Sequence, residues 1–287
     1  MGTAARGEAM LGRRLRFGLA TILGLARRGF FIPYRYADTL APPGERPSYA
    51  AIEALMRGLE DDFGAVVAGL EEYADDLRAI GGDAPPAPRW DQDWFPRLDA
   101  AVAYAMVRRL RPRRIVEIGS GHSTRFLARA VADGGLATAI TAIDPAPRAS
   151  LAGLAVELLR IPLDRVGEML LAGLAAGDVL FVDSSHILVP GSDVDRVLNH
   201  VLPALPAGVH IHFHDIFLPD DYPAEWAWRG YNEQLGVAAL LSGRGCRLRF
   251  ASHYATTRMS DALAGSVVAG LPLIAGARES SLWLEKC

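Results

Sequence analysis

Short apolar runs alternate, through the middle of the chain, with stretches in which apolar residues recur at helical spacing. The runs predict strands at 115–118, 140–144, 156–159, 177–183 and 208–215. Helices are predicted between them, one starting near Ser123 or Thr124 and others over about 164–175 and 192–201. Further strands are predicted at 247–254 and 281–284. Because strands alternate with helices, we expect a mostly parallel sheet with right-handed crossovers.

The region before these strands has a helical pattern. One apolar face runs through residues 48–80 and acidic residues crowd the other, which predicts a long amphipathic helix that ends at Gly81-Gly82. Residues 81–89, rich in Gly, Pro and Ala, predict a linker, and a further helix is expected over about 99–110. We therefore predict an N-terminal helical extension over residues 1–85 and a main domain over residues 86–287.

Arginines flank an apolar stretch near the N-terminus. Three of them precede residues 17–26, and the pair Arg27-Arg28 follows. Ten residues are too few to span a bilayer, and this pair stands where a secretory leader needs small residues. We expect a helix packed on the protein's own body or on a second subunit of a homo-oligomer. Peripheral membrane contact through residues 10–32 is the alternative.

Composition limits the possible fold class, partners and metal sites. A length of 287 residues with 51% hydrophobic content favours one large α/β domain plus an extension. The net charge of −3 provides no basic field, so nucleic acid is not expected as a partner. Cys246 and Cys287 are the only cysteines, which favours a reducing cytoplasm and no cysteine-based metal site.

A glycine turn follows the first of the central strands. Gly119-Ser120-Gly121 allows a sharp turn and a close approach of a ligand to the main chain, at the point where a helix begins. The second strand ends at Asp144, about 20 residues further on, where an acid would hold a ribose. Polar clusters also end the fourth and fifth strands, at 183–186 and 214–215. All of these positions meet at one edge of a parallel sheet, which predicts a ligand site there.

Three motifs together resemble the class I S-adenosylmethionine-dependent methyltransferases, in their small-molecule branch. They are Glu-Ile-Gly-Ser-Gly-x-Ser-Thr at 117–124, Phe-Val-Asp-Ser-Ser-His at 181–186 and His-Phe-His-Asp-Ile-Phe-Leu-Pro at 212–219. The resemblance covers residues 94–283 and implies a doubly wound, mostly parallel, Rossmann-like seven-stranded sheet that an antiparallel strand pair closes. Ser123 stands where the common turn has a third glycine.

The same resemblance implies S-adenosylmethionine as the cofactor. Glu117 and the two glycines would lie against its methionine part, Asp144 would hold the ribose, and Asp164 would be a weaker candidate for the adenine amino group. The residues expected to bind the cofactor are Glu117, Gly119, Ser120, Gly121, Ser123, Asp144, Asp164 and Asp183.

Two strand ends carry the candidate catalytic residues Asp183, His186, His214 and Asp215. Two carboxylates placed close together need a positive group between them. A histidine could fill this role and take a proton from the acceptor, which is the route we favour. The alternative is magnesium held by Asp183 and Asp215. His210, His212 and His214 share one face of their strand, where core histidines are expected rather than zinc ligands, but His214 differs because it stands at the strand tip beside Asp215 and faces the expected cofactor.

The aromatic segment after the fifth strand would cover an acceptor, with Tyr222, Trp226, Trp228 and Asn232 as candidate contacts. We therefore predict methyl transfer from S-adenosylmethionine to an oxygen, with nitrogen less favoured, of a small polar acceptor such as a sugar or natural product. One alternative is an NAD-dependent oxidoreductase, which the incomplete glycine motif disfavours. The other is a non-catalytic binding protein on a methyltransferase-like fold.

Overall fold

The structure is a computed structural model that describes residues 12, 15–167, 170–171 and 173–287. The chain forms two compact units, one ending at Pro42 and the other spanning Pro43–Cys287. In the first unit, residues 15–22 are helical and η1 spans Ala37–Thr39. Arg13 and Arg14, which belong to the predicted basic segment, lie outside the described residues.

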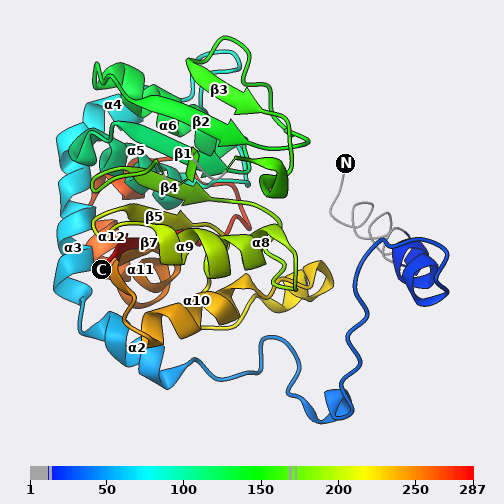
Figure 1. Ribbon diagram of the computed structural model, residues 1–287. Helices are drawn as coiled ribbons and strands as arrows, with labels where there is room; N and C mark the ends of the chain where they lie inside the picture. Colours follow the sequence, from blue (N-terminus) through cyan, green and yellow to red (C-terminus); the bar gives the residue numbers. More distant parts are fainter. Residues whose placement is uncertain (1–11, 13–14, 168–169, 172) are drawn as a thin grey trace. The chain divides into compact units, whose positions relative to one another are not determined.

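The larger unit is built on one sheet of seven strands in the order β3-β2-β1-β4-β5-β7-β6 (Figure 1). Their bounds are Arg114–Ile118 for β1, Ala139–Ile143 for β2, Val156–Leu159 for β3, Val179–Val182 for β4, His210–Phe213 for β5, Cys246–Ala251 for β6 and Leu282–Lys286 for β7. Strands β1 to β5 pair in parallel, and β7 runs antiparallel to β5 and β6. The predicted fold class is confirmed.

Helices flank this sheet and bury its faces (Figure 1). The α-helices are α2 Ala50–Arg57, α3 Glu60–Ala68, α4 Ala74–Ala79, α5 Arg97–Leu110, α6 His122–Asp133, α8 Asp193–Arg196, α9 Leu202–Ala204, α10 Glu233–Ser242, α11 Ser252–Arg258 and α12 Ser260–Ala264. Short helical turns are η2 Gly69–Tyr73, η3 Leu163–Arg165, η5 Ala224–Arg229 and η6 Val267–Gly270, and η4 Val197–Val201 is a π-helical turn.

The long helix predicted over residues 48–80 is divided into α2, α3, η2 and α4. The first breaks fall at Gly58 and Gly69, the C-caps of α2 and α3, and glycine has a lower helix propensity than every residue but proline. The apolar face was correctly predicted. Met56 and Phe63 are fully buried, and the ring of Phe63 packs edge-on against Phe250 of β6.

The compact unit therefore starts well before residue 85, since the helices over 50–80 share one core with the sheet. The division into an extension over residues 1–85 and a main domain over residues 86–287 stays a prediction. Two further elements differ from expectation. Of the helix predicted over 164–175, the structure has η3 at the start and helical residues at 170–171, while 168, 169 and 172 lie outside the described residues. Strand β6 ends at Ala251, where α11 takes over.

Candidate active site

The glycine turn lies where the ends of β1 and β4 meet. Gly119 has φ +95°, and a Cβ there would collide with the main-chain carbonyl of Asp183. Its N–H donates to Ile143 O at the end of β2, at 2.9 Å. Only glycine can therefore bring these three strand ends so close together, which opens a cavity above them.

Glu117, on β1, lies fully buried beneath this turn. Its Oε1 accepts a hydrogen bond from Ser123 Oγ at 2.5 Å, whereas its Oε2 has no partner among the described residues. Burial raises the pKa of Glu117 to about 8, and the hydrogen bond from Ser123 opposes this only in part. A buried carboxyl oxygen without a partner is the kind of group that a ligand completes.

Two further acids predicted for the cofactor lie around the same cavity. Asp144 follows β2 and accepts hydrogen bonds from Ser120 Oγ and from Ala146 N, both at 2.8 Å. Asp164 lies in η3, after β3. Both line a cavity of about 830 Å³, and so do Gly119, Ser120, Gly121, Ser123 and Asp183. The fully buried Glu117 lies behind the lining, and the other predicted cofactor residues are brought together at its wall.

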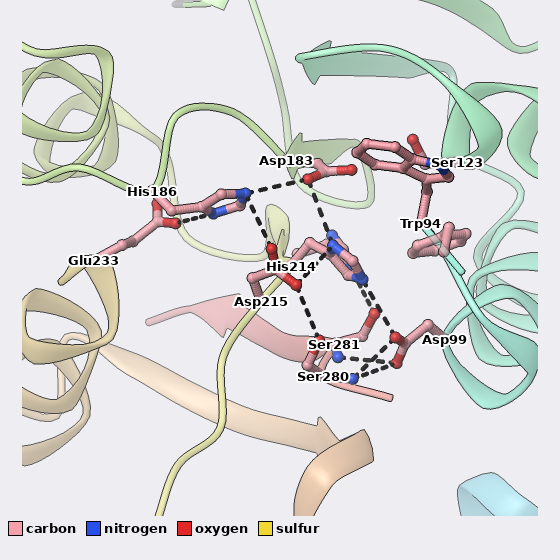
Figure 2. Close-up of polar contacts among 12 residues, drawn as sticks. Trp94, Asp99, Ser123, Asp183, His186, His214, Asp215, Glu233, Ser280 and Ser281 are labelled. Carbon is pink, nitrogen blue, oxygen red and sulfur yellow. Dashed lines mark hydrogen bonds and ion pairs between the residues drawn. The ribbon is translucent and has the colours of Figure 1, made fainter. Parts of the chain in front are cut away.

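Asp183, His186, His214 and Asp215 meet at one end of the same cavity (Figure 2). His186 Nε2 lies 3.5 Å from Asp183 Oδ1 and 3.4 Å from Asp215 Oδ2. His214 Nδ1 lies 3.4 Å from Asp183 Oδ1 and 3.5 Å from Asp215 Oδ1. The two carboxylates are therefore held between two histidines. Asp183 has the most exposed side chain of the four, at 26%.

Two buried carboxylates that the sequence did not point to hold the far nitrogens of these rings (Figure 2). Glu233 Oε2 lies 2.8 Å from His186 Nδ1, and Asp99 Oδ2 lies 3.3 Å from His214 Nε2. Asp99 also accepts hydrogen bonds from the main-chain N–H groups of Ser280 and Ser281. Each histidine ring thus lies between one buried carboxylate, Glu233 or Asp99, and the two carboxylates that line the cavity, Asp183 and Asp215.

The charges in this cluster shift the protonation of its members. Burial alone would lower the pKa of His186, but Asp183, Asp215 and Glu233 outweigh it and raise that pKa well above its usual value. The pKa of His214 is raised in the same way, against burial, by Asp183, Asp215 and Asp99. Burial would raise the pKa of Asp183, but the two histidines lower it strongly. The surrounding carboxylates therefore favour the charged form of both histidines.

Backbone strain marks the same residues. His186 has φ +59° and Asp215 has φ +56°, in the left-handed region that residues with a side chain rarely adopt. Such conformations cost roughly 1–3 kcal/mol each and persist where the surroundings impose them, as they do at functional sites. Both residues follow strand ends, so the strained turns direct the side chains toward each other across β4 and β5.

The candidate metal ligands of this cluster have partners within it. The Asp183 and Asp215 oxygens face histidine nitrogens in pairs, and no group of three or more His, Cys, Asp or Glu side chains in the described part of the chain is arranged to hold one. The row of histidines on β5 is also divided. His210 is half-buried, while His212 stacks on Phe181 at 3.6 Å between ring centroids and contacts Ser281 Oγ.

Of the residues predicted to contact the acceptor, only Trp226 lines the cavity. Tyr222 is buried and accepts a hydrogen bond from Gln234 N, while Trp228 is 45% exposed away from the lining. Asn232 bonds to the main chain of Leu188. These three stay predictions. Arg229, Tyr231 and Trp94, which the sequence did not single out for this role, do line the cavity.

Arg229 sits in an aromatic setting at the acceptor end. Its guanidinium lies 3.7 Å from the centroid of the Trp226 ring and 5.3 Å from that of Tyr231, and its NH1 lies 3.8 Å from Asp215 Oδ2. A cation over aromatic rings is attracted by their negative faces. The alternating aromatic and charged residues of η5 were visible in the sequence, but nothing there indicated which of them would face inward.

Residues 116–216 match the family model described as a methyltransferase domain. Among solved structures, the S-adenosylhomocysteine-bound methyltransferase PaMTH1 of Podospora anserina is 18% identical, with 90% of this chain and 99% of that chain covered and a TM-score of 0.43. The plantazolicin methyltransferase BpumL, bound to S-adenosylhomocysteine, is 13% identical, with 82% and 99% covered and a TM-score of 0.45. The comparison with curated proteins finds no match.

The O-methyltransferase TomG of Streptomyces achromogenes, involved in tomaymycin synthesis and bound to S-adenosylmethionine, is 20% identical, with 65% and 80% covered and a TM-score of 0.36. Similarities this distant carry no weight for acceptor or mechanism. The family match spans the glycine turn and both strand ends that carry the candidate catalytic residues, within the observed seven-stranded sheet. These residues form a methyltransferase domain, which is the class of protein that the sequence motifs predicted.

Proposed function

We propose that this enzyme transfers the methyl group to an oxygen of a small polar acceptor, with a sugar or a natural product as the expected class and nitrogen as the less favoured atom. The observation that carries the proposal is the cluster of Asp183, Asp215, His186 and His214, which lines the same cavity as the glycine turn. A hydroxyl group must lose a proton as it is methylated, and this cluster offers groups to receive it.

The residues around the glycine turn support the cofactor assignment. S-adenosylmethionine, when bound, supplies an activated methyl group on a sulfonium. Glu117, with its buried and unpartnered Oε2, fits the cationic amino group of the methionine part. Asp144, already oriented by Ser120, would hold the ribose hydroxyls, and Asp164 would face the adenine amino group.

The proton route follows from the pairing of the histidines. Asp183 is the most exposed acid and would orient the acceptor hydroxyl, but its lowered pKa makes it a weak base. His186 or His214 would take the proton once it has lost its own. Because the pKa of each histidine is raised, we expect the transfer rate to increase as the pH rises through and above neutrality.

Magnesium is not required in this proposal, because the two carboxylates already have histidine partners. The test is methyl transfer from radiolabelled S-adenosylmethionine to a panel of sugars, phenols and amines, after dialysis against EDTA. We expect O-methylated products from the EDTA-treated protein. Turnover that EDTA abolishes and magnesium restores would overturn the histidine route. Binding of S-adenosylhomocysteine with no product across the panel would favour a binding protein instead.

We also propose that the N-terminal segment makes a peripheral membrane or subunit contact. Leu25, Phe30, Phe31 and Ile32 are 68–77% exposed, and the sequence between Glu8 and Asp38 contains arginines but no acidic residue. In the described part of the chain, no helix combines the length and apolarity that crossing a bilayer needs. A cytoplasmic location fits the two free cysteines.

Deletion of residues 1–40 tests this second proposal. We expect the full chain to float with vesicles that contain anionic lipid, or to form larger oligomers in light scattering, and the deleted chain to do neither. Cofactor affinity should be unchanged. Arg27→Glu with Arg28→Glu is the matched control for charge, because it keeps every apolar side chain. If deletion changes neither property, the proposal fails.

A further inference from the structure

The loop after β4 that carries His186 is fixed by the start of α10. The N–H groups of Asn232 and Glu233 both donate to His186 O, at 3.1 and 3.3 Å. The side-chain amide of Asn232 bonds to both N and O of Leu188, at 2.6 and 3.0 Å. These four bonds offset the strained left-handed backbone of His186 and hold the loop in one conformation.

The side chain of Glu233 adds a bond to the ring itself. Its Oε2 lies 2.8 Å from His186 Nδ1, and the carboxylate is fully buried in the first turn of α10, where the helix dipole favours a negative charge. With Nδ1 engaged, Nε2 of the same ring is directed at Asp183 and Asp215. The ring of Tyr231, 4.6 Å away between centroids, covers one face of the imidazole.

We propose that Glu233 is a positioning residue for methyl transfer, which fixes the ring orientation of His186 so that Nε2 faces the Asp183–Asp215 pair and the acceptor. This inference rests on the proposed function of His186. Glu233 touches neither the cavity nor a reacting atom, and acts only through the imidazole that it bonds.

The burial of Glu233 argues against a role in stability alone. Its Oε1 has no partner among the described residues, and the pKa of the carboxyl is raised by burial although His186 opposes the rise. Removing a carboxylate from water is costly, and one ring nitrogen offsets that cost only in part. A buried acid with one oxygen unpartnered among the described residues and the other on the ring of His186 is placed to act on that ring.

The test compares Glu233→Gln, Glu233→Asp and Asn232→Ala in the full chain. In the wild type we expect a downfield proton resonance from His186 Nδ1–H, which His186→Gln assigns by its loss. Glu233→Gln should abolish this resonance and lower kcat by more than about tenfold, with KM for S-adenosylmethionine unchanged. Glu233→Asp keeps the charge and should recover part of kcat.

Asn232→Ala is the matched structural control. It removes two loop bonds but not the bond to the ring, so it should lower the unfolding temperature and leave the resonance in place. The proposal is overturned if folded Glu233→Gln keeps the wild-type kcat, or if Asn232→Ala loses the resonance as well. If the wild type transfers no methyl group at all, the proposed function fails instead, while the resonance still decides whether Glu233 and His186 are paired.

Discussion

The two ends of the cavity are built in different ways. At the cofactor end, the polar contacts join residues close in sequence: Ser123 to Glu117 six positions away, and Ser120 to Asp144 across 24. At the acceptor end, Glu233 bonds His186 across 47 positions and Asp99 bonds His214 across 115. The contacts of the first end lie within one strand-turn-helix unit and the strand that follows it, whereas those of the second end join elements far apart in the sequence.

The two ends of the cavity also differ in how many of their buried charged groups have partners. The cofactor end leaves a buried acid with a free oxygen, ready for a ligand. At the acceptor end, four carboxylates already surround two histidines and Arg229 approaches one of them. Changes at the acceptor end should therefore affect the rate and the stability of the fold, and changes at the cofactor end should affect mainly ligand binding.

The largest effect is expected for His214→Ala, which removes a ring that contacts Asp99, Asp183 and Asp215. If His214 receives or relays the acceptor proton, kcat should fall by roughly 10²–10⁴-fold. Binding of S-adenosylhomocysteine, followed by calorimetry, should be retained. A rate within a factor of a few of wild type would remove His214 from the mechanism, and lost cofactor binding would show that the two ends are not separable.

The sequence predicted the two histidines and the two aspartates that line the cavity. It did not predict the two buried carboxylates behind the histidine rings, and the reason is physical. His186 and His214 follow apolar strands, and strand ends at the carboxyl edge are where ligands bind. Asp99 is indistinguishable, in sequence, from an acid that favours a helix N-terminus, and Glu233 from a surface acid beside aromatics. Their function depends on contacts with other elements, which no local pattern encodes.

Asp99→Asn should have the next largest effect, on the stability of the fold. Asp99 is fully buried and bonds both the cationic His214 and two main-chain N–H groups before β7. Removal of one partner of a buried ion pair costs roughly 3–5 kcal/mol. Denaturant unfolding should show this loss, and Asp61→Asn, at an exposed position of α3, is the control. Equal midpoints for both variants would contradict a charged His214.

At the cofactor end, Asp144→Ala should weaken the binding of S-adenosylhomocysteine by roughly 1.5–3 kcal/mol, the scale of a hydrogen bond to a charged group. The loss of the Ser120 contact accompanies it, but both residues are partly exposed, so the fold should keep its unfolding temperature. Glu157→Ala, an exposed acid on the neighbouring strand β3, is the control. Unchanged calorimetric affinity for Asp144→Ala would reject the ribose assignment.

The fold itself was more predictable than the site. Short apolar runs indicated the central strands β1, β2, β4 and β5, because a parallel strand covered by helices on both faces is apolar along most of its length. The helix over residues 48–80 was seen as one, although Gly58 and Gly69 divide it. A single glycine disfavours a helix only weakly, so whether the helix breaks there depends on how its two parts pack on the sheet. The local sequence does not contain that information.

The smallest effect concerns the protonation of Glu117. Its pKa of about 8 means that the carboxyl is protonated in about nine-tenths of the unliganded molecules at pH 7. A cationic amino group beside Oε2 would favour the carboxylate, so binding should release close to one proton at that pH. Calorimetry with S-adenosylhomocysteine in two buffers of different ionisation enthalpy measures the release, and identical enthalpies would contradict the contact.

The protonation of Glu117 also determines how cofactor affinity and the stability of the free protein change with pH. Affinity should increase as the pH rises from 6 to 8, by up to about tenfold per unit, because less work is spent on ionising Glu117. Stability of the free protein should change in the opposite direction, since the unfolded carboxyl loses its proton near its ordinary pKa while the folded one keeps it up to about 8. Glu117→Gln cannot ionise, so its affinity and its stability should lose these contributions while the acceptor end stays intact.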